Sequence, residues 1–221
     1  MKSNKLIASI ISNCLFIAFE IAGFVFAFGD LGFETLKFYT QLSNLFAFLV
    51  VSVYVVFEFR QLKNGLQIPK FIKTLKYVAT CVLTMTFLIV LFVLAPFSGY
   101  SLGFLLFVSS MLFHHTLCPI IAIITFLFFE NYDRFTRKEN FYGLLPTIIY
   151  ALVFLPLNIL KLTVGPYFFL EVYSQPLYMS VVWGIVCLGT AYLIVWTLGL
   201  IKNKISKKTN KSWQKNYIGL I

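Results

Sequence analysis

The chain has 221 residues, a formal net charge of +10, and a composition that is 60% hydrophobic but only 12% charged. Because an ordinary soluble domain carries about 25% charged residues, these proportions exclude a soluble globular enzyme and predict a protein that folds in a membrane. The positive charge needs no nucleic acid to explain it, and we expect membrane lipids rather than nucleic acid to face the basic side chains.

The apolar residues fall in six blocks, each long enough for a transmembrane helix, because about 20 such residues cross a hydrocarbon core of about 30 Å. The blocks cover residues 6–28, 38–57, 77–96, 103–129, 142–160 and 179–201. Each must be helical, since lipid offers no partner to backbone N–H and C=O groups. The sequence therefore predicts an all-α polytopic fold, with one six-helix transmembrane domain over 1–201 and a basic tail over 202–221.

The distribution of basic residues predicts the orientation, since Lys and Arg in short loops stay on the cytoplasmic side. All but two of the 18 Lys and Arg residues fall at the N-terminus, in the second loop up to Lys76, in the fourth loop, or in the tail from Lys202. The exceptions are Lys37 and Lys161. We therefore expect both termini to be cytoplasmic, in a multi-pass integral protein of the cell membrane.

The first block also has one feature of a signal peptide, because Lys2 and Lys5 precede it as a basic region. However, its apolar stretch is longer than the usual length of about 7–15 residues. It also contains Glu20 and ends without a small-residue cleavage site. We therefore expect a transmembrane helix here.

Glu20 is the acidic residue inside that first span. An ionised carboxylate near the bilayer centre costs several kcal/mol unless it is paired, protonated or exposed to water. We expect its partner to be His114, His115 or Asn44. A protonated, hydrogen-bonded structural carboxyl is the alternative to a catalytic or ion-binding one.

The second block begins with a polar cluster in the stretch KFYTQLSNLF. Four hydrogen-bonding side chains fall within five positions, namely Thr40, Gln41, Ser43 and Asn44. Polar residues inside transmembrane segments are functional candidates. Hydrogen bonds to neighbouring helices, worth about 0.6 kcal/mol on average, would also explain them, so a functional cluster and a helix-packing face both stay open.

The fourth block contains the two histidines of the chain, His114 and His115. Its 27 residues would form a helix of about 40 Å, longer than the core requires. Measured from Glu130 at the inner end, the outer boundary falls near residue 110, which places His115 about 8 Å deep and within reach of the second block. Pro119 removes the hydrogen bond to the carbonyl of His115, so we expect a bend beside the histidines.

The remaining polar candidate is Asn158 in the fifth block. The loop after it contains the aromatic stretch GPYFFLEVYSQP, which we expect to cap the outer end of the bundle at headgroup level. The four cysteines all fall inside predicted spans without paired spacing, which favours neither a disulfide framework nor a metal site. No glycine-rich phosphate loop occurs, and we expect no cofactor.

Four short motifs, spread over essentially the whole chain, resemble the Pr-six-Pr family of bacterial six-pass membrane proteins. They are FYTQLSN, HHTLCP, YALVFLPLN and GPYFFLEVYSQP. That family is related to the androgen-induced and androgen-dependent proteins of animals, which are intramembrane hydrolases that cleave fatty-acid esters of hydroxy fatty acids. The resemblance implies a six-helix membrane fold and a lipid-ester hydrolase activity, with a threonine nucleophile and a histidine.

The resemblance also implies which residues carry the activity. The animal threonine follows a basic and aromatic run, as Thr40 follows Lys37, and the animal histidine lies just ahead of a proline, as the doubled histidine does here. The HxxxP spacing of the bacterial proteins selects His115. After Thr40 this chain reads Gln-Leu-Ser-Asn, which departs from the animal pattern.

In the mechanism that the resemblance implies, Thr40 attacks an ester carbonyl to form an acyl-enzyme. His115 acts as the base and then protonates the leaving alcohol. The residues expected to support the site are His114, Glu20, Gln41, Ser43, Asn44 and Asn158. Among them, the side chains that follow Thr40 would donate to the oxyanion. We expect a lipid-ester substrate that enters sideways from the outer leaflet.

Two other functions stay open. A small transporter would bind a proton, an ion or another solute at Glu20, Asn44, Asn158 and the histidines. A non-catalytic scaffold would use the polar residues only to pack helices. Hydrolysis predicts dependence on Thr40, transport predicts dependence on Glu20, and a scaffold predicts loss of folding when these residues are changed.

Overall fold

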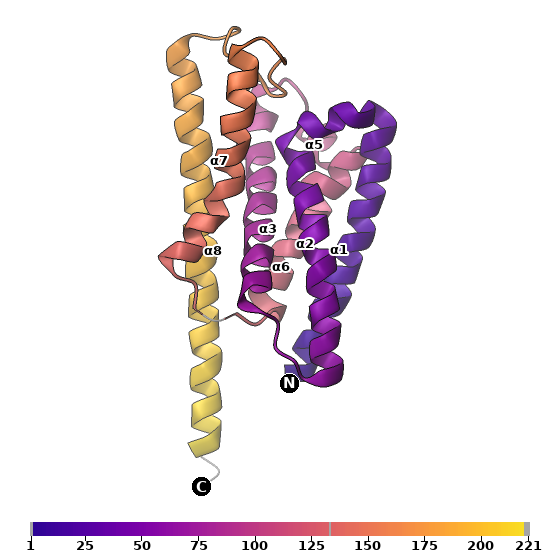
Figure 1. Cartoon of the computed structure of the whole chain (residues 1–221), viewed down its shortest axis with the longest axis vertical. Helices are drawn as coiled ribbons and strands as arrows, with labels where there is room; N and C mark the ends of the chain where they lie inside the picture. Colours follow the sequence, from indigo (N-terminus) through magenta and orange to yellow (C-terminus); the bar gives the residue numbers. More distant parts are fainter. Residues whose placement is uncertain (1, 133, 219–221) are drawn as a thin grey trace.

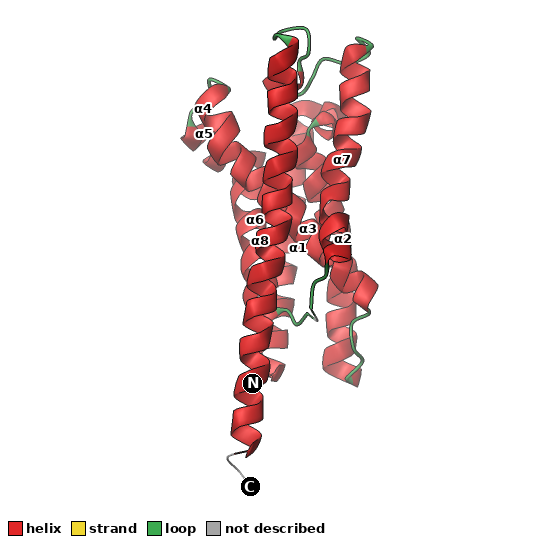
Figure 2. Ribbon diagram, turned by 90° about the vertical axis from the view of Figure 1, so that its left-hand side faces the viewer, coloured by secondary structure: helices red, strands yellow, loops and turns green. Residues whose placement is uncertain are grey.

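The computed structural model describes residues 2–132 and 134–218, and the side chains of residues 4–132 and 134–206. Within these residues the chain forms helices and no strand (Figure 2). Six helical segments are long and apolar enough to cross a membrane: Asn4–Lys37, Tyr39–Asn64, Lys70–Phe97, Leu112–Phe129, Arg137–Ile159 and Leu177–Ser206. The predicted all-α fold with six membrane-spanning helices is therefore confirmed.

The α-helices are α1 (Lys2–Leu31), α2 (Tyr39–Asn64), α3 (Lys70–Ile89), α4 (Ala95–Phe97), α5 (Leu102–Phe107), α6 (Cys118–Ile124), α7 (Arg137–Ile159) and α8 (Leu177–Ile218). Two 3-10 turns are η1 (Gly32–Lys37) and η5 (Phe168–Leu170), and three π-helical turns are η2 (Val90–Leu94), η3 (Leu112–Leu117) and η4 (Thr125–Phe129). The π-helical turns lie within the third and fourth spans, so these two spans are wider and less regular than the others.

The helix α3 lies at the centre of the bundle and packs against α2, α6, α7 and α8. Figure 1 shows α7 and α8 on one side of α3, and α1 and α2 on the other. The start of α1 and the end of α8 lie at the same end of the molecule, which we call the terminal end, and the opposite end is the far end (Figure 1). That the terminal end faces the cytoplasm stays a prediction.

Aromatic and small residues bring α3, α7 and α8 together. Tyr77 of α3 is fully buried, and its O–H lies 2.7 Å from the carbonyl oxygen of Val195 in α8, which accepts its hydrogen bond. A Cβ atom at Gly143 of α7 would come within 2.8 Å of a methyl group of Val195. The glycine is therefore needed for the close approach of α7 to α8.

The fourth span differs from its prediction, because residues 103–129 do not form one helix. The helix α5 ends at Phe107, Val108 is extended with φ −105° and ψ 132°, and Ser109 has a positive φ of 51°. The spanning segment begins only at Leu112. The physical reason is the excess length noted above, since a single helix over these residues would overshoot the hydrocarbon core.

The basic tail also differs from its prediction, because α8 continues through residue 202 to Ile218 without a break. The side chain of Lys202 is buried, with an exposed fraction of 3%, so this residue belongs to the bundle and not to a solvated tail. The side chains of the tail from residue 207 onward are not among the side chains that the structure describes.

Candidate functional site

Thr40 lies in the first turn of α2 and is buried, with an exposed fraction of 5%. The helix begins here because Phe38 has an extended backbone, with φ −81° and ψ 133°, and its N–H donates back to the carbonyl oxygen of Thr35. The first N–H groups of a helix have no acceptor within that helix. The backbone N–H of Thr40 therefore needs an acceptor from another part of the chain.

Tyr167, in the segment between α7 and α8, supplies that acceptor. Its phenolic oxygen accepts from the Thr40 N–H at 3.3 Å and lies 3.2 Å from Thr40 Oγ1. Because the oxygen already accepts a bond from the backbone, its O–H is free to donate to the threonine hydroxyl. Burial raises the pKa of Tyr167, so the phenol stays protonated. Tyr167 is therefore able to donate a hydrogen bond beside Thr40.

Thr40 and Tyr167 line a cavity of about 210 Å³ between α2, α3, α7 and α8. Most of the lining is apolar, and includes Met85, Ile89, Leu94, Ala151, Leu155, Phe169, Trp183 and Leu188. Of the other hydroxyl groups there, that of Thr86 donates to a carbonyl of its own helix, whereas that of Ser180 has no hydrogen-bond partner among the described residues. Such a lining fits an acyl chain rather than a polar metabolite.

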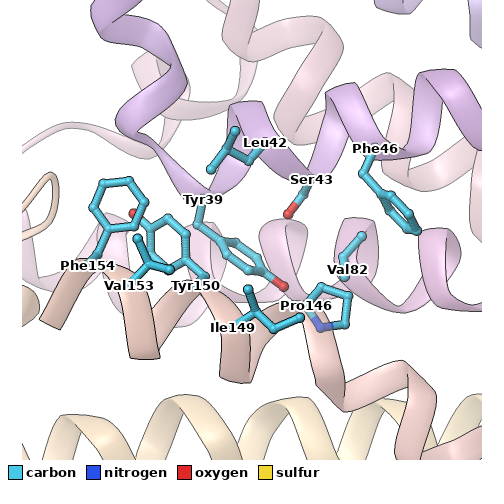
Figure 3. Close-up of a pocket in the computed structure, with 10 residues that line it drawn as sticks. All are labelled: Tyr39, Leu42, Ser43, Phe46, Val82, Pro146, Ile149, Tyr150, Val153 and Phe154. Atoms are coloured by element: carbon cyan, nitrogen blue, oxygen red, sulfur yellow. The ribbon is translucent and has the colours of Figure 1, made fainter. Parts of the chain in front are cut away.

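A second hollow of about 370 Å³ lies between α2 and α7 and includes Ser43 in its lining. Figure 3 shows the ring of Tyr39 pointing from α2 toward α7, beside Tyr150. The Tyr39 hydroxyl is 2.8 Å from Thr147 Oγ1, and its ring centroid is 5.2 Å from that of Tyr150. Both tyrosines also line the cavity at Thr40, so they stand between the two spaces.

The two histidines are both buried but point to different neighbours. His115 Nδ1 lies 2.7 Å from the carbonyl oxygen of Leu105 in α5, and a carbonyl can only accept, so the proton is on Nδ1. The Nε2 atom of His115 is then left with a lone pair, as a general base requires. His114 instead has its Nε2 atom 3.4 Å from Glu20 Oε2 in α1.

The structure brings only some of the predicted site residues together. No hydrogen bond joins Thr40 and His115 in the part of the chain that the structure describes. Asn44 connects their two elements, because its Nδ2 donates to the carbonyl oxygen of Thr40 at 2.8 Å and to that of His114 at 3.3 Å. Asn44 is thus placed to fix the backbone beside Thr40 rather than to donate to an oxyanion there.

Three further predicted residues lie in separate surroundings. Gln41 is buried, and its Oε1 atom has no hydrogen-bond partner among the described residues. Asn158 accepts from the Val172 N–H at 2.9 Å and donates to the carbonyl oxygen of Thr163 at 3.2 Å. Asn158 therefore holds the segment between α7 and α8, which contains Tyr167. Ser43 lines the second hollow.

Near the terminal end the structure contains a buried ionic network that sequence reasoning missed. The Lys76 ammonium is 3.3 Å from Glu130 Oε1, and both side chains are almost fully buried. Tyr132 donates to the other oxygen of Glu130 at 2.6 Å. Asn13 of α1 bridges Glu58 and Glu130 with one amide nitrogen, at 3.0 and 3.4 Å.

Lys202 completes this end of the bundle. Its ammonium donates to the carbonyl oxygens of Phe126, Leu127 and Glu130, at 2.6, 3.0 and 2.7 Å. These carbonyls are at the C-terminal end of η4, where helical carbonyls lack intrahelical donors and favour a cation. Lys76 and Lys202, expected in a basic loop and in the basic tail, are therefore buried side chains of the bundle instead.

One signal in the sequence pointed to the network. Ser9 and Asn13 fall on one stripe of the first helix, at a spacing of four residues, which places them on one buried face. Nothing in the sequence indicated which lysines and glutamates from other segments would meet that stripe.

The described residues contain no group of three or more His, Cys, Asp or Glu side chains able to hold a metal ion. Comparison of the chain with the profiles of protein families, with curated proteins and with solved structures finds no match. What is shown of the protein is thus a six-helix bundle suited to a membrane, with a hydroxyl pair on an apolar cavity and two buried clusters of ionisable groups.

Proposed function

We propose that this multi-pass membrane protein belongs to the Pr-six-Pr family and is an intramembrane lipid-ester hydrolase with Thr40 as its nucleophile. One observation carries the proposal: the Thr40 hydroxyl lies on the wall of a buried apolar cavity, 3.2 Å from a tyrosine hydroxyl. A nucleophilic hydroxyl beside a fixed donor and an acyl-sized space is the arrangement that acyl transfer needs.

The chemistry begins when Thr40 Oγ1 attacks the ester carbonyl carbon. The hydroxyl proton passes to His115 Nε2, the carbonyl oxygen becomes an oxyanion, and collapse of this intermediate expels the alcohol, which takes the proton from His115. Water then hydrolyses the acyl-threonine by the same route. Tyr167 is the hydrogen-bond donor nearest the reacting carbonyl and would stabilise the oxyanion.

The mechanism requires His115 to reach Thr40. His115 Nε2 must come within hydrogen-bond distance of Thr40 Oγ1, directly or through one water, whereas in this structure the ring is held by Leu105. The carbonyl that holds it belongs to the short helix α5. A shift of α5 would move this acceptor and with it the His115 ring.

The hollow between α2 and α7 would admit the substrate. Its lining is almost entirely apolar, and it is separated from the cavity at Thr40 by Tyr39 and Tyr150. An acyl chain that enters from the lipid would pass these rings with little loss of hydrophobic contact. Entry from the outer leaflet follows if the terminal end is cytoplasmic, as the basic residues predict.

Ester hydrolysis by the purified protein in detergent tests the proposal. Long-chain acyl esters of a fluorogenic alcohol are the substrates, and the variants are Thr40→Ala, Thr40→Ser, Tyr167→Phe and His115→Gln. We expect Thr40→Ala and His115→Gln to fall to the background rate, Thr40→Ser to keep part of the activity, and Tyr167→Phe to lose about 100-fold in kcat, as loss of one oxyanion donor does.

Thr86→Ala is the matched control, because Thr86 lines the same cavity but its hydroxyl donates to the carbonyl oxygen of Val82. This variant should keep wild-type activity. Full activity in a folded Thr40→Ala variant, or no hydrolysis of any ester by folded wild-type protein, would contradict the proposal.

Transport and scaffolding are weaker candidates. Glu20, Asn44 and His114 lie together, but both hydrogen bonds of Asn158 go to the segment between α7 and α8, so the predicted set of ion ligands does not form one cluster. An inert scaffold leaves the Thr40–Tyr167 pair on the cavity without a role.

A further inference from the structure

Glu20 and His114 form an isolated pair inside the bundle. Each has an exposed side-chain fraction of 0%, and Glu20 Oε2 is 3.4 Å from His114 Nε2. Neither the carboxyl oxygens of Glu20 nor the ring nitrogens of His114 have a hydrogen-bond partner among the described residues. Native structures rarely leave such groups buried without a reason.

The surrounding residues are shaped to hold this pair. A Cβ atom at Gly23 of α1 would overlap the ring of His114, so only glycine leaves room for the ring at this place. The ring of Phe24, also in α1, has its centroid 4.7 Å from that of His114. The position of the imidazole beside Glu20 is therefore fixed by packing and does not result from a flexible side chain.

No other charged group neutralises the pair. On α1 the nearest polar residue of the buried stripe is Asn13, which is seven residues or about 10 Å from Glu20. Phe16, fully buried, lies between them, so the Lys76–Glu130 network is separated from the pair.

The other elements packed around the pair contribute no permanent charge. On the η3 side the second titratable group is His115, whose ring is directed to Leu105. The α6 helix contributes the Cys118 thiol, with its sulfur 4.0 Å from the carbonyl oxygen of Phe16. From α2 the neighbour is the uncharged Asn44.

We propose that Glu20 and His114 bind a single proton between them and so form an intramembrane proton-binding site. With no proton the pair is an anion and with two it is a cation, and either net charge in a dry core costs several kcal/mol. With one proton the pair is neutral, whether the proton is on Oε2 or on Nε2. Transfer within the pair breaks one O–H bond and forms one N–H bond, with no other reactant.

This site does not depend on the proposed hydrolase. It uses no atom of Thr40, Tyr167 or His115, and it gives the buried carboxyl of α1 a chemical role of its own.

Nitrogen NMR of the histidine rings tests the proposal, because the chain has only two histidines. Protein labelled with ¹⁵N-histidine is placed in lipid bilayers, the His115→Gln variant assigns the His114 signals, and spectra are recorded between about pH 5 and 9, which brackets the ordinary imidazole transition. In wild type we expect the His114 signals to stay constant over this range. In the Glu20→Gln variant we expect the ¹⁵N chemical shifts of His114 to change to the values of a neutral imidazole that has no acidic partner.

Glu58→Gln is the matched control, because Glu58 is also a buried glutamate of a transmembrane helix but bonds to Asn13 instead of a histidine. It should leave the His114 signals unchanged. The proposal is overturned if wild-type His114 titrates near pH 6.5 like an isolated imidazole, or if Glu20→Gln leaves its signals where they are in wild type.

A measurement on wild type alone covers the case in which Glu20→Gln does not fold. Labelling of glutamate with ¹³C at the carboxyl carbon and of histidine with ¹⁵N should give a through-space coupling at His114, the ring that lies against a glutamate. Absence of that coupling contradicts the pairing itself.

Discussion

The two buried clusters of ionisable groups differ in how completely their hydrogen bonds are satisfied. At the terminal end, Glu130 accepts from Lys76, Asn13 and Tyr132, and Lys202 donates to three carbonyls. Nearer the far end, Glu20 has only His114 and the weakly donating Cys118 thiol beside it, and the Oδ1 atom of Asn44 has no partner among the described residues.

The difference separates two roles for polar groups in a membrane. A network with most of its donors and acceptors matched, such as the one at the terminal end, where Asn13 Oδ1 alone among the named groups has no partner in the described residues, holds helices together. A buried pair with few partners is tolerated when it serves binding or catalysis. We therefore expect changes at the terminal end to lower stability, and changes around Glu20 and Thr40 to affect proton binding and hydrolysis more than stability.

The largest loss of stability is expected from Lys76→Met. This change leaves the Glu130 carboxylate buried without its counter-ion, and removal of one partner of a buried pair costs about 3–5 kcal/mol. Thermal unfolding in detergent measures the effect. The double variant Lys76→Met with Glu130→Gln removes both charges and should recover part of the lost stability. A Lys76→Met variant as stable as wild type would contradict the structural role of the terminal-end network.

A smaller loss is expected from Lys202→Met. It leaves the carbonyls at the end of η4 without their donor, and a buried acceptor left unsatisfied costs about 1–3 kcal/mol. Lys204→Met is the control, because Lys204 lies two positions further along α8 with an exposed side chain. Equal unfolding temperatures for the two variants would show that Lys202 does not support the bundle.

Asn44→Ala should cost less stability than either lysine change. Its amide donates to the carbonyl oxygens of Thr40 and His114, and polar contacts between membrane helices average about 0.6 kcal/mol. Its effect on ester hydrolysis should be larger than its effect on unfolding, since the backbone of Thr40, the proposed nucleophile, loses its connection to η3. A rate unchanged from wild type would remove Asn44 from the site.

The smallest effect is expected from Lys37→Ala. Lys37 pairs with Glu34 in η1, but their side chains are 45% and 69% exposed. Exposed ion pairs contribute about 0–1 kcal/mol, so the unfolding temperature should hardly change. A loss as large as that of Lys76→Met would show that exposure does not distinguish the two pairs.

The fold was predictable from sequence where hydrophobic length decides it, and not where tertiary contacts do. All six spans follow from apolar blocks, because lipid forces such blocks into helices. The excess length of the fourth block placed its outer boundary near residue 110, close to Leu112, where the span begins. The backbone conformation of Val108 and Ser109 that ends α5 was not predicted, since neither residue type marks the end of a helix. Lys76 and Lys202 were assigned to a basic loop and the basic tail, because a lysine at the end of an apolar block has the same local sequence whether it is buried or exposed.

The candidate site was predictable to a similar degree. The structure places Glu20 against His114, one of its three expected partners. The contact of Thr40 with Tyr167 was not predicted, since Tyr167 comes from a loop without periodicity, and loop geometry depends on contacts such as those of Asn158.

Identification of the residue that a reactive ester analogue modifies is the most direct test of the central claim. Wild-type protein treated with a long-chain fluorophosphonate is digested, and mass spectrometry locates the adduct. Ser180, whose hydroxyl lines the same cavity and has no hydrogen-bond partner among the described residues, provides the competing position. The account predicts an adduct on Thr40 that is absent in Thr40→Ala and retained in Ser180→Ala, whereas an adduct on Ser180, or none in folded wild type, would contradict it.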